Sequence, residues 1–170
     1  MTDVEEHTLK KTSLYDRHLA LNGKMVDFAG WSLPVYYTSI LAEHQWTRNS
    51  CSFFDVSHLG EIHVKGRDAF SFLQKRFTND LGKLGDRRMQ YHLLCDEMGY
   101  TLDDVLIYRE NKDEYYVIVN ASNIEKDFAE MKKGAGGFSV SIEDQSDAMA
   151  CLAIQGPKSE LILQKSSAFG

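Results

Sequence analysis

Two neighbouring carboxylates, Asp103 and Asp104, lie inside an otherwise apolar stretch, residues 102–107. If this stretch is a β-strand, successive side chains point to opposite faces, so at least one carboxylate faces the packed side of a sheet or a cleft. A buried carboxylate is costly unless it is hydrogen-bonded or protonated, and proteins tolerate that cost most often at functional sites. The pair is therefore a candidate site, although the pattern alone favours a turn residue beside a solvated neighbour.

A serine followed by a histidine, Ser57-His58, comes shortly after Asp55 and raises the question of nucleophilic catalysis. Chain neighbours diverge on a strand, so these two side chains cannot form a Ser–His pair without an unusual turn. We expect instead a loop in which the serine and aspartate side chains make local hydrogen bonds.

Residues 28–37, with the sequence FAGWSLPVYY, are dense in aromatic rings. Such rings can line a pocket for a flat heterocycle, but an ordinary aromatic core is the interpretation that the pattern favours. The six histidines show no HxxxH spacing on one helix face, so we expect no metal site.

Composition excludes several classes of function. The chain has 170 residues and a formal net charge of -6 without a basic stripe, so we do not expect a nucleic-acid partner. No stretch reaches the roughly 18 apolar residues that a membrane span needs. The three cysteines are far apart, which favours reduced thiols and a cytoplasmic location.

The elements that would position these residues follow from apolar spacing, caps and turns. Strands joined by hairpins outnumber helices and show no regular βαβ alternation, so we predict an α+β fold with mostly antiparallel sheets and flanking helices. The expected helices are a short one capped by Ser13, one capped by Ser39, residues 68–77, residues 124–133 capped by Asn123, and a last one after Gly156-Pro157. The expected strands are residues 24–28, 61–65, 90–95, 101–108, 115–120, 138–142 and 149–154.

We expect residues 1–11 to form a disordered or poorly ordered N-terminus, because they are acidic and then basic without an apolar core. The last expected helix carries Leu161, Ile162 and Leu163 close to the end of the chain. An apolar helix of this kind usually packs against a later element, so we expect the chain to be truncated.

Seven blocks stand in order along the chain: residues 24–40 around KMVDFAGW and YYTSI, 54–61 (FDVSHLGE), 78–80 (TND), Tyr91 with Gly99, Asp103-Asp104, 119–121 (VNA) and 154–157 (IQGP). Together they resemble the T-proteins, the tetrahydrofolate-dependent aminomethyltransferases of the glycine cleavage system. The resemblance runs from about residue 9 to residue 163. It implies that residues 12–170 are the N-terminal part of the folate-binding domain, with the C-terminal remainder absent.

The resemblance also implies a function. T-proteins are transferases that move the methylene from the aminomethyl-dihydrolipoyl arm of H-protein to tetrahydrofolate and release ammonia. The family's essential carboxylate falls on Asp104, and no metal is implied. By the same resemblance, the residues near the folate are Asp104, Tyr91, Leu59, Tyr108, Val119 and Asn120. Further folate contacts of the family come from beyond residue 170, so we expect this chain alone to be incomplete and inactive.

Two positions depart from the family pattern. Leu59 stands where a methionine is common, and Gly99-Tyr100 stands where Gly-Gly is common, so the shape of the pocket is open to change. The alternative hypothesis is a non-catalytic folate-binding or iron–sulfur-assembly module of the same fold. A folate-using demethylase or oxidase-linked relative is a third. Retention of Asp104 together with the block FAGW favours the transferase.

Overall fold

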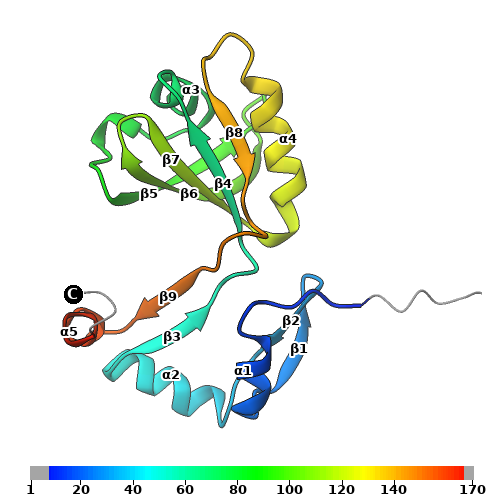
Figure 1. Cartoon of the computed structure of the whole chain (residues 1–170), viewed down its shortest axis with the longest axis vertical. Helices are drawn as coiled ribbons and strands as arrows, with labels where there is room; N and C mark the ends of the chain where they lie inside the picture. The colour runs from blue at the N-terminus through cyan, green and yellow to red at the C-terminus, as the bar shows by residue number, and fades with distance from the viewer. Residues whose placement is uncertain (1–7, 167–170) are drawn as a thin grey trace, which may run out of the picture. The chain divides into compact units, whose positions relative to one another are not determined.

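A computed structural model describes residues 8–166, which form two compact units (Figure 1). Unit 1 takes the residues up to 58 together with those from 150 onward, and unit 2 takes residues 59–149. Of the N-terminal segment expected to be poorly ordered, residues 1–7 lie outside the described residues. Lys10, in the remainder of that segment, exchanges backbone hydrogen bonds with Gly30 and Ser32, each 2.9 Å long.

Unit 1 contains two antiparallel strand pairs, β1 with β2 and β3 with β9. The second pair joins the two chain segments of unit 1, because Ser52 lies opposite Gln155. The elements of unit 1 are α1 (Tyr15–Ala20), β1 (Met25–Phe28), β2 (Trp31–Pro34), α2 (Ile40–Asn49), β3 (Ser52–Asp55), β9 (Leu152–Gln155) and α5 (Ser159–Lys165).

The two helix caps expected in this unit differ in outcome. Ser39 caps α2 as predicted: its Oγ accepts the backbone N–H of Ala42 at 3.4 Å. The prediction for Ser13 was wrong. The N-cap residue of α1 is Leu14, no side chain caps the helix, and the Tyr15 N–H bonds to the carbonyl of Thr12 in a turn.

Unit 2 is one five-stranded sheet with helices against one face. Its strand order is β5-β6-β7-β4-β8, and every neighbouring pair is antiparallel, which confirms the predicted fold class. Its strands are β4 (Gly60–Lys65), β5 (Arg88–Cys95), β6 (Thr101–Asn111), β7 (Glu114–Val119) and β8 (Ser141–Asp144). Its helices are α3 (Ala69–Arg76) and α4 (Ile124–Gly134), with short 3-10 turns at Leu81–Lys83 and Ala121–Asn123.

The core of unit 2 lies between one face of this sheet and the two helices. All five strands contribute residues to it, and β4, β6 and β7 do so with alternate residues, as the two-residue period of a strand requires. They meet the apolar faces of α3 and α4. The buried members include Ile62, Val64, Phe72, Leu73, Val105, Ile107, Val117, Val119 and Met131.

Two predictions in unit 2 need correction. Asn123 is the N-cap residue of α4, as predicted, but its side chain makes no capping hydrogen bond, and its amide donates to Asp103. The strand expected from residue 138 begins only at Ser141. The reason is that Ser139 is held at the start of α3, where its N–H donates to the Asp68 carboxylate at 2.7 Å.

Within residues 8–166, none of the helices has the length and apolar character that crossing a bilayer requires.

The turn from β4 into α3 depends on a glycine. Gly66 has φ +147°, and a Cβ at this position would lie 2.3 Å from the carbonyl oxygen of Ser139. We expect Gly66→Ala to destabilise the protein by about 2 kcal/mol or more, because both the strain and the clash are with backbone. Urea denaturation measures this.

Gly136→Ala is the matched control, because nothing lies within 4 Å of a Cβ built there. Equal stability of the two variants would contradict the assigned geometry.

Candidate functional site

The two adjacent carboxylates point to opposite faces of β6. Asp103 is 5% exposed and lies on the face that carries the core, whereas Asp104 is exposed on the open face. The expectation that one of the pair faces the packed side is confirmed.

Asp103 is surrounded by hydrogen-bond donors from other elements. Its Oδ1 accepts from the side-chain amides of Asn120 at 2.8 Å and Asn123 at 2.7 Å, and its Oδ2 accepts from the backbone N–H of Asn120 at 3.2 Å. Burial raises the pKa of Asp103, but hydrogen bonds from Asp127, Asn120 and Asn123 outweigh it and hold the pKa below its usual value. Asp103 is therefore a buried charge with an anchoring role.

Asp104 is held by the same asparagine. The side-chain amide of Asn120 lies 3.1 Å from the backbone oxygen of Asp104 and 3.3 Å from its Oδ1. On the neighbouring strand the phenol of Tyr91, 54% exposed, lies near enough to Asp104 for the carboxylate to act on its pKa. Desolvation, followed by the charge of Asp104, raises the pKa of Tyr91, so the phenol remains a donor at neutral pH.

The open sheet face beside Asp104 is apolar and aromatic. The strand register places Tyr91 opposite Leu106, Met89 opposite Tyr108, and Leu106 opposite Ile118. Met89, Tyr91 and Leu106 are exposed. A flat heterocycle with N–H groups at one edge fits such a surface, because its ring can lie on the aromatic and aliphatic side chains while the carboxylate accepts its hydrogens.

The structure brings together most of the residues predicted to lie near the folate. Asp104, Tyr91 and Tyr108 share the open face, and Asn120 adjoins them at the end of β7. Val119 differs, since its side chain is 1% exposed and belongs to the core on the other face. Leu59 is half-buried directly before β4, whose first residue, Gly60, pairs with Val119.

Sequence reasoning missed Glu61, which is 2% exposed on β4. Among the described residues, neither of its carboxylate oxygens has a hydrogen-bond partner. Burial, and then the charge of Asp144, raise the pKa of Glu61 to about 7. The alternating pattern predicts a solvated position for Glu61. Nothing in that pattern indicates that the turn containing Gln145 and Ser146 bonds to its backbone.

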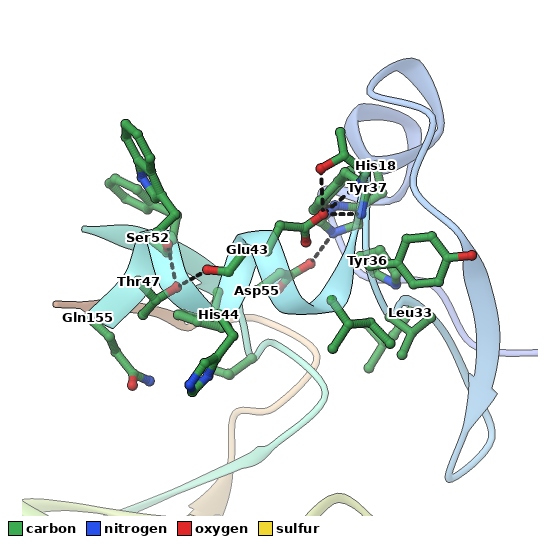
Figure 2. Close-up of a pocket in the computed structure, with 18 of the residues that line it drawn as sticks. His18, Leu33, Tyr36, Tyr37, Glu43, His44, Thr47, Ser52, Asp55 and Gln155 are labelled. Atoms are coloured by element: carbon green, nitrogen blue, oxygen red, sulfur yellow. Dashed lines mark hydrogen bonds and ion pairs between the residues drawn. The ribbon is translucent and has the colours of Figure 1, made fainter. Parts of the chain in front are cut away.

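Unit 1 contains a separate cavity of about 950 Å³ beside α2 (Figure 2). Several residues of the aromatic segment 28–37 line it, so the pocket interpretation of that segment holds, although the pattern favoured a core. They are Phe28, Leu33, Pro34, Val35, Tyr36 and Tyr37.

One wall of this cavity is polar. The ring of His18 bridges the Tyr37 hydroxyl, at 2.7 Å, and the Asp55 carboxylate, at 2.8 Å (Figure 2). Burial raises the pKa of Asp55, but hydrogen bonds from Thr12, His18 and Ser57 outweigh it and lower the pKa. These side chains hydrogen-bond to one another, so we interpret the wall as a fixed hydrogen-bond network and not as an activated nucleophile.

The hydrogen-bonded loop expected around Ser57 is confirmed. Its backbone N–H donates to Asp55 at 3.1 Å, and its hydroxyl exchanges hydrogen bonds with the backbone of Cys151. Across residues 8–166, histidine, cysteine, aspartate and glutamate side chains nowhere gather in a group of three or more that could hold a metal.

Comparison with known proteins places these features in context. The family model described as the GCVT N-terminal domain matches residues 14–169. An aminomethyltransferase from Thermoanaerobacter sp. is 52% identical over 157 residues, and those from Bacillus subtilis and Thermus thermophilus are 49% identical over 156. The matches cover 92% of this chain but only 43% to 45% of each relative.

A solved structure gives the same result. The glycine cleavage system aminomethyltransferase T from Bartonella henselae is 34% identical with a TM-score of 0.86, and the match covers 92% of this chain and 43% of that one. The chain thus spans less than half the length of the relatives it matches.

The two carboxylates of the pair should differ in their effect on stability. Asp103→Ala leaves the half-buried amides of Asn120 and Asn123 without their shared acceptor, so we expect a loss of about 3 kcal/mol or more. Asp104→Ala removes an exposed side chain and should cost roughly 0.5 kcal/mol or less. Urea denaturation of both variants tests this contrast, and similar losses would show that Asp103 is not an anchor.

Glu61 should make stability depend on pH. Its folded-state pKa of about 7 lies above the ordinary value of 4.5, so the folded protein retains a proton that the unfolded chain releases. This contribution is fully present below pH 4.5 and is lost as pH rises through 7. Its slope is at most about 1.4 kcal/mol per pH unit.

Glu61→Gln should remove this part of the slope and leave a protein more stable than the wild type at pH 8. The exposed Glu97→Gln is the control. Thermal unfolding between pH 4 and 8 measures the change, and an unaltered slope in Glu61→Gln would refute the assignment.

Proposed function

Because the chain belongs to the family of GCVT N-terminal domains, we propose that it forms the tetrahydrofolate-binding part of an aminomethyltransferase of the glycine cleavage system, a T-protein. In this proposal the methylene on the aminomethyl-dihydrolipoyl arm of H-protein passes to tetrahydrofolate, and ammonia is released. The observation that carries the proposal is the exposed carboxylate of Asp104, which accepts a hydrogen bond from Asn120 and lies beside Tyr91 on an apolar, aromatic surface.

The side chains of this surface suit a reduced pterin. When bound, tetrahydrofolate supplies the amine that takes up the methylene. Asp104 would accept hydrogen bonds from the N–H groups at the edge of the pterin, with its carboxylate held by Asn120 beside Tyr91. Leu106 and Tyr108, on the same face of β6, would lie against the ring. Tyr91 and Asn120 therefore act on the ligand both directly and through Asp104.

The rate of such a transfer depends chiefly on how the two reactants are placed. Holding an amine at near-attack distance from the carbon that it attacks supplies several kcal/mol of the barrier reduction. A fixed carboxylate adds to this effect because it stabilises positive charge that develops on the attacking nitrogen. An aspartate on a strand is short and has few rotamers, so Asp104 is suited to both tasks.

The remaining parts of the proposal concern the whole protein. H-protein as the donor, a cytoplasmic location and the need for polypeptide beyond this chain all belong to it. Its relatives are more than twice as long as the part that this chain matches, so folate binding needs to be compared between this chain and a form of the relatives' length. Binding without any transfer in the longer form would favour the non-catalytic folate-binding alternative.

The test is the substitution Asp104→Asn in the complete enzyme. We expect turnover from aminomethyl-lipoyl H-protein to fall by about 100-fold or more, as for the loss of one preorganised electrostatic group. Tetrahydrofolate affinity should stay within several-fold, since the amide keeps one acceptor oxygen. Single-turnover kinetics and equilibrium titration with tetrahydrofolate measure the two effects.

Asp147→Asn, at an exposed position, is the matched control and should leave both measurements unchanged. If turnover survives Asp104→Asn, the role given to this carboxylate is wrong.

A further inference from the structure

Unit 1 buries very little apolar surface within itself. Among the described residues, every buried apolar side chain except that of Leu33 belongs to unit 2. Neither α2 nor α5 contains a buried residue, although both helices carry several apolar ones. A helix of ten residues is marginal by itself in water, and so is a sheet of two strands. The elements of unit 1 therefore need further apolar packing to be stable.

Four large apolar side chains that line the cavity beside α2 are exposed. Ile40 and Trp46 come from α2, and Phe53 and Phe54 come from β3. Each of the four is more than a third exposed, with Trp46 at 63% and Phe53 at 58%. We call these four residues the α2–β3 patch. Exposed apolar clusters of this kind mark interaction sites.

The α2–β3 patch is held in a defined shape. The hydroxyl groups of Thr47 on α2 and Ser52 on β3 are hydrogen-bonded at 2.7 Å (Figure 2). The indole N–H of Trp46 donates to the carbonyl oxygen of Cys51, directly before β3, at 3.0 Å. Both bonds tie the helix to the strand that follows it, so a partner meets a surface that is already formed and loses less entropy on binding.

The pair of strands beside the patch has open edges. Within residues 8–166, β3 and β9 pair only with each other, so each strand leaves one edge unpaired. An open edge presents N–H and C=O groups on which a further strand can form. Phe53 and Phe54 are neighbours on β3 and point to opposite faces, so apolar side chains are exposed on both faces of the pair. The surface suits an extended segment that adds a strand and continues around the pair.

We infer that the α2–β3 patch and the open edges beside it are the docking surface for the polypeptide that follows this part in the relatives, and that an extended segment of it adds a strand to the pair. The relatives share unit 1 and are more than twice as long as the match. The matching family model is an N-terminal domain, so the further polypeptide comes after it.

A second copy of this chain fits the surface less well. A two-fold contact between copies joins one edge or one face of the pair to the same edge or face of the partner, and it leaves the other apolar face exposed. The inference rests on the proposed function only in that the function needs further polypeptide. It involves neither Asp104 nor tetrahydrofolate.

The experiment compares hydrogen exchange in two proteins: this chain, and the same chain joined to the remaining part of the aminomethyltransferase from Bacillus subtilis. In the joined protein, the amides of β3 and β9 that point away from the pair should exchange about 100-fold or more slowly than in this chain, because they bond to an added strand. The amides shared by β4 and β7 are paired in both proteins and serve as the internal reference.

A substitution in the patch separates docking from a general effect of chain length. Phe53→Asp should change this chain alone very little, because the side chain is mostly exposed there. In the joined protein it should reduce the protection of the β9 amides by about tenfold or more, since a charge replaces a covered ring. Met98→Asp, at an exposed apolar position between β5 and β6 of unit 2, is the matched control and should leave this protection unchanged.

Equal exchange of the β3 and β9 amides in the two unsubstituted proteins overturns the inference, and this comparison decides even if Phe53→Asp fails to fold. Sedimentation of this chain tests the other occupant: a dimer with protected β3 amides that Phe53→Asp converts to a monomer shows that a second copy covers the surface, and it also overturns the inference.

A tetrahydrofolate titration of the joined protein tests the proposed function separately. If Asp104→Ala leaves binding unchanged while β3 and β9 are protected, the role given to Asp104 fails and the docking surface stands. If binding depends on Asp104 but β3 and β9 exchange as fast as in this chain, the docking surface fails and the role of Asp104 stands.

Discussion

The buried carboxylate of Asp103 is the interaction on which the candidate site depends. It accepts hydrogen bonds from the residue after β7 and from the residue before α4. A buried charge that loses a partner costs several kcal/mol, so these three chain segments are held together with little freedom. The position of Asn120, and with it the surroundings of Asp104, follows from this arrangement.

The alternating direction of side chains along β6 places the candidate site next to this anchor. Because successive residues face opposite sides, Asp103 can reach the donors on the packed side while Asp104 stands on the open side only one residue away. The open face continues along β6 through Leu106 and Tyr108. One strand therefore supplies a rigid attachment to the core, an exposed carboxylate and a surface for a ring, which is the kind of support that a preorganised site needs.

Local signals in the sequence predicted the elements but not the contacts between them. The hairpin of β5 and β6, the cap at Ser39 and the antiparallel fold class follow from spacing and turn residues, and the structure confirms them. Asn123 looked like a cap because a cap is the local use of such a residue; its amide is taken by Asp103, twenty positions earlier. β3 was missed because its partner, β9, follows about a hundred residues later.

Asp127 did leave a signal that could have been used. It lies four residues after Asn123 and four before the buried Met131, so all three share one face of α4. An acidic residue on the apolar side of a helix calls for a partner. Within residues 8–166, Asp127 has no hydrogen-bond partner, and burial raises its pKa to about 7. Amide donors instead lower the pKa of the buried Asp103, and Asp104 is exposed. The surroundings of each carboxyl group, and not its residue type, therefore decide how readily it carries a charge.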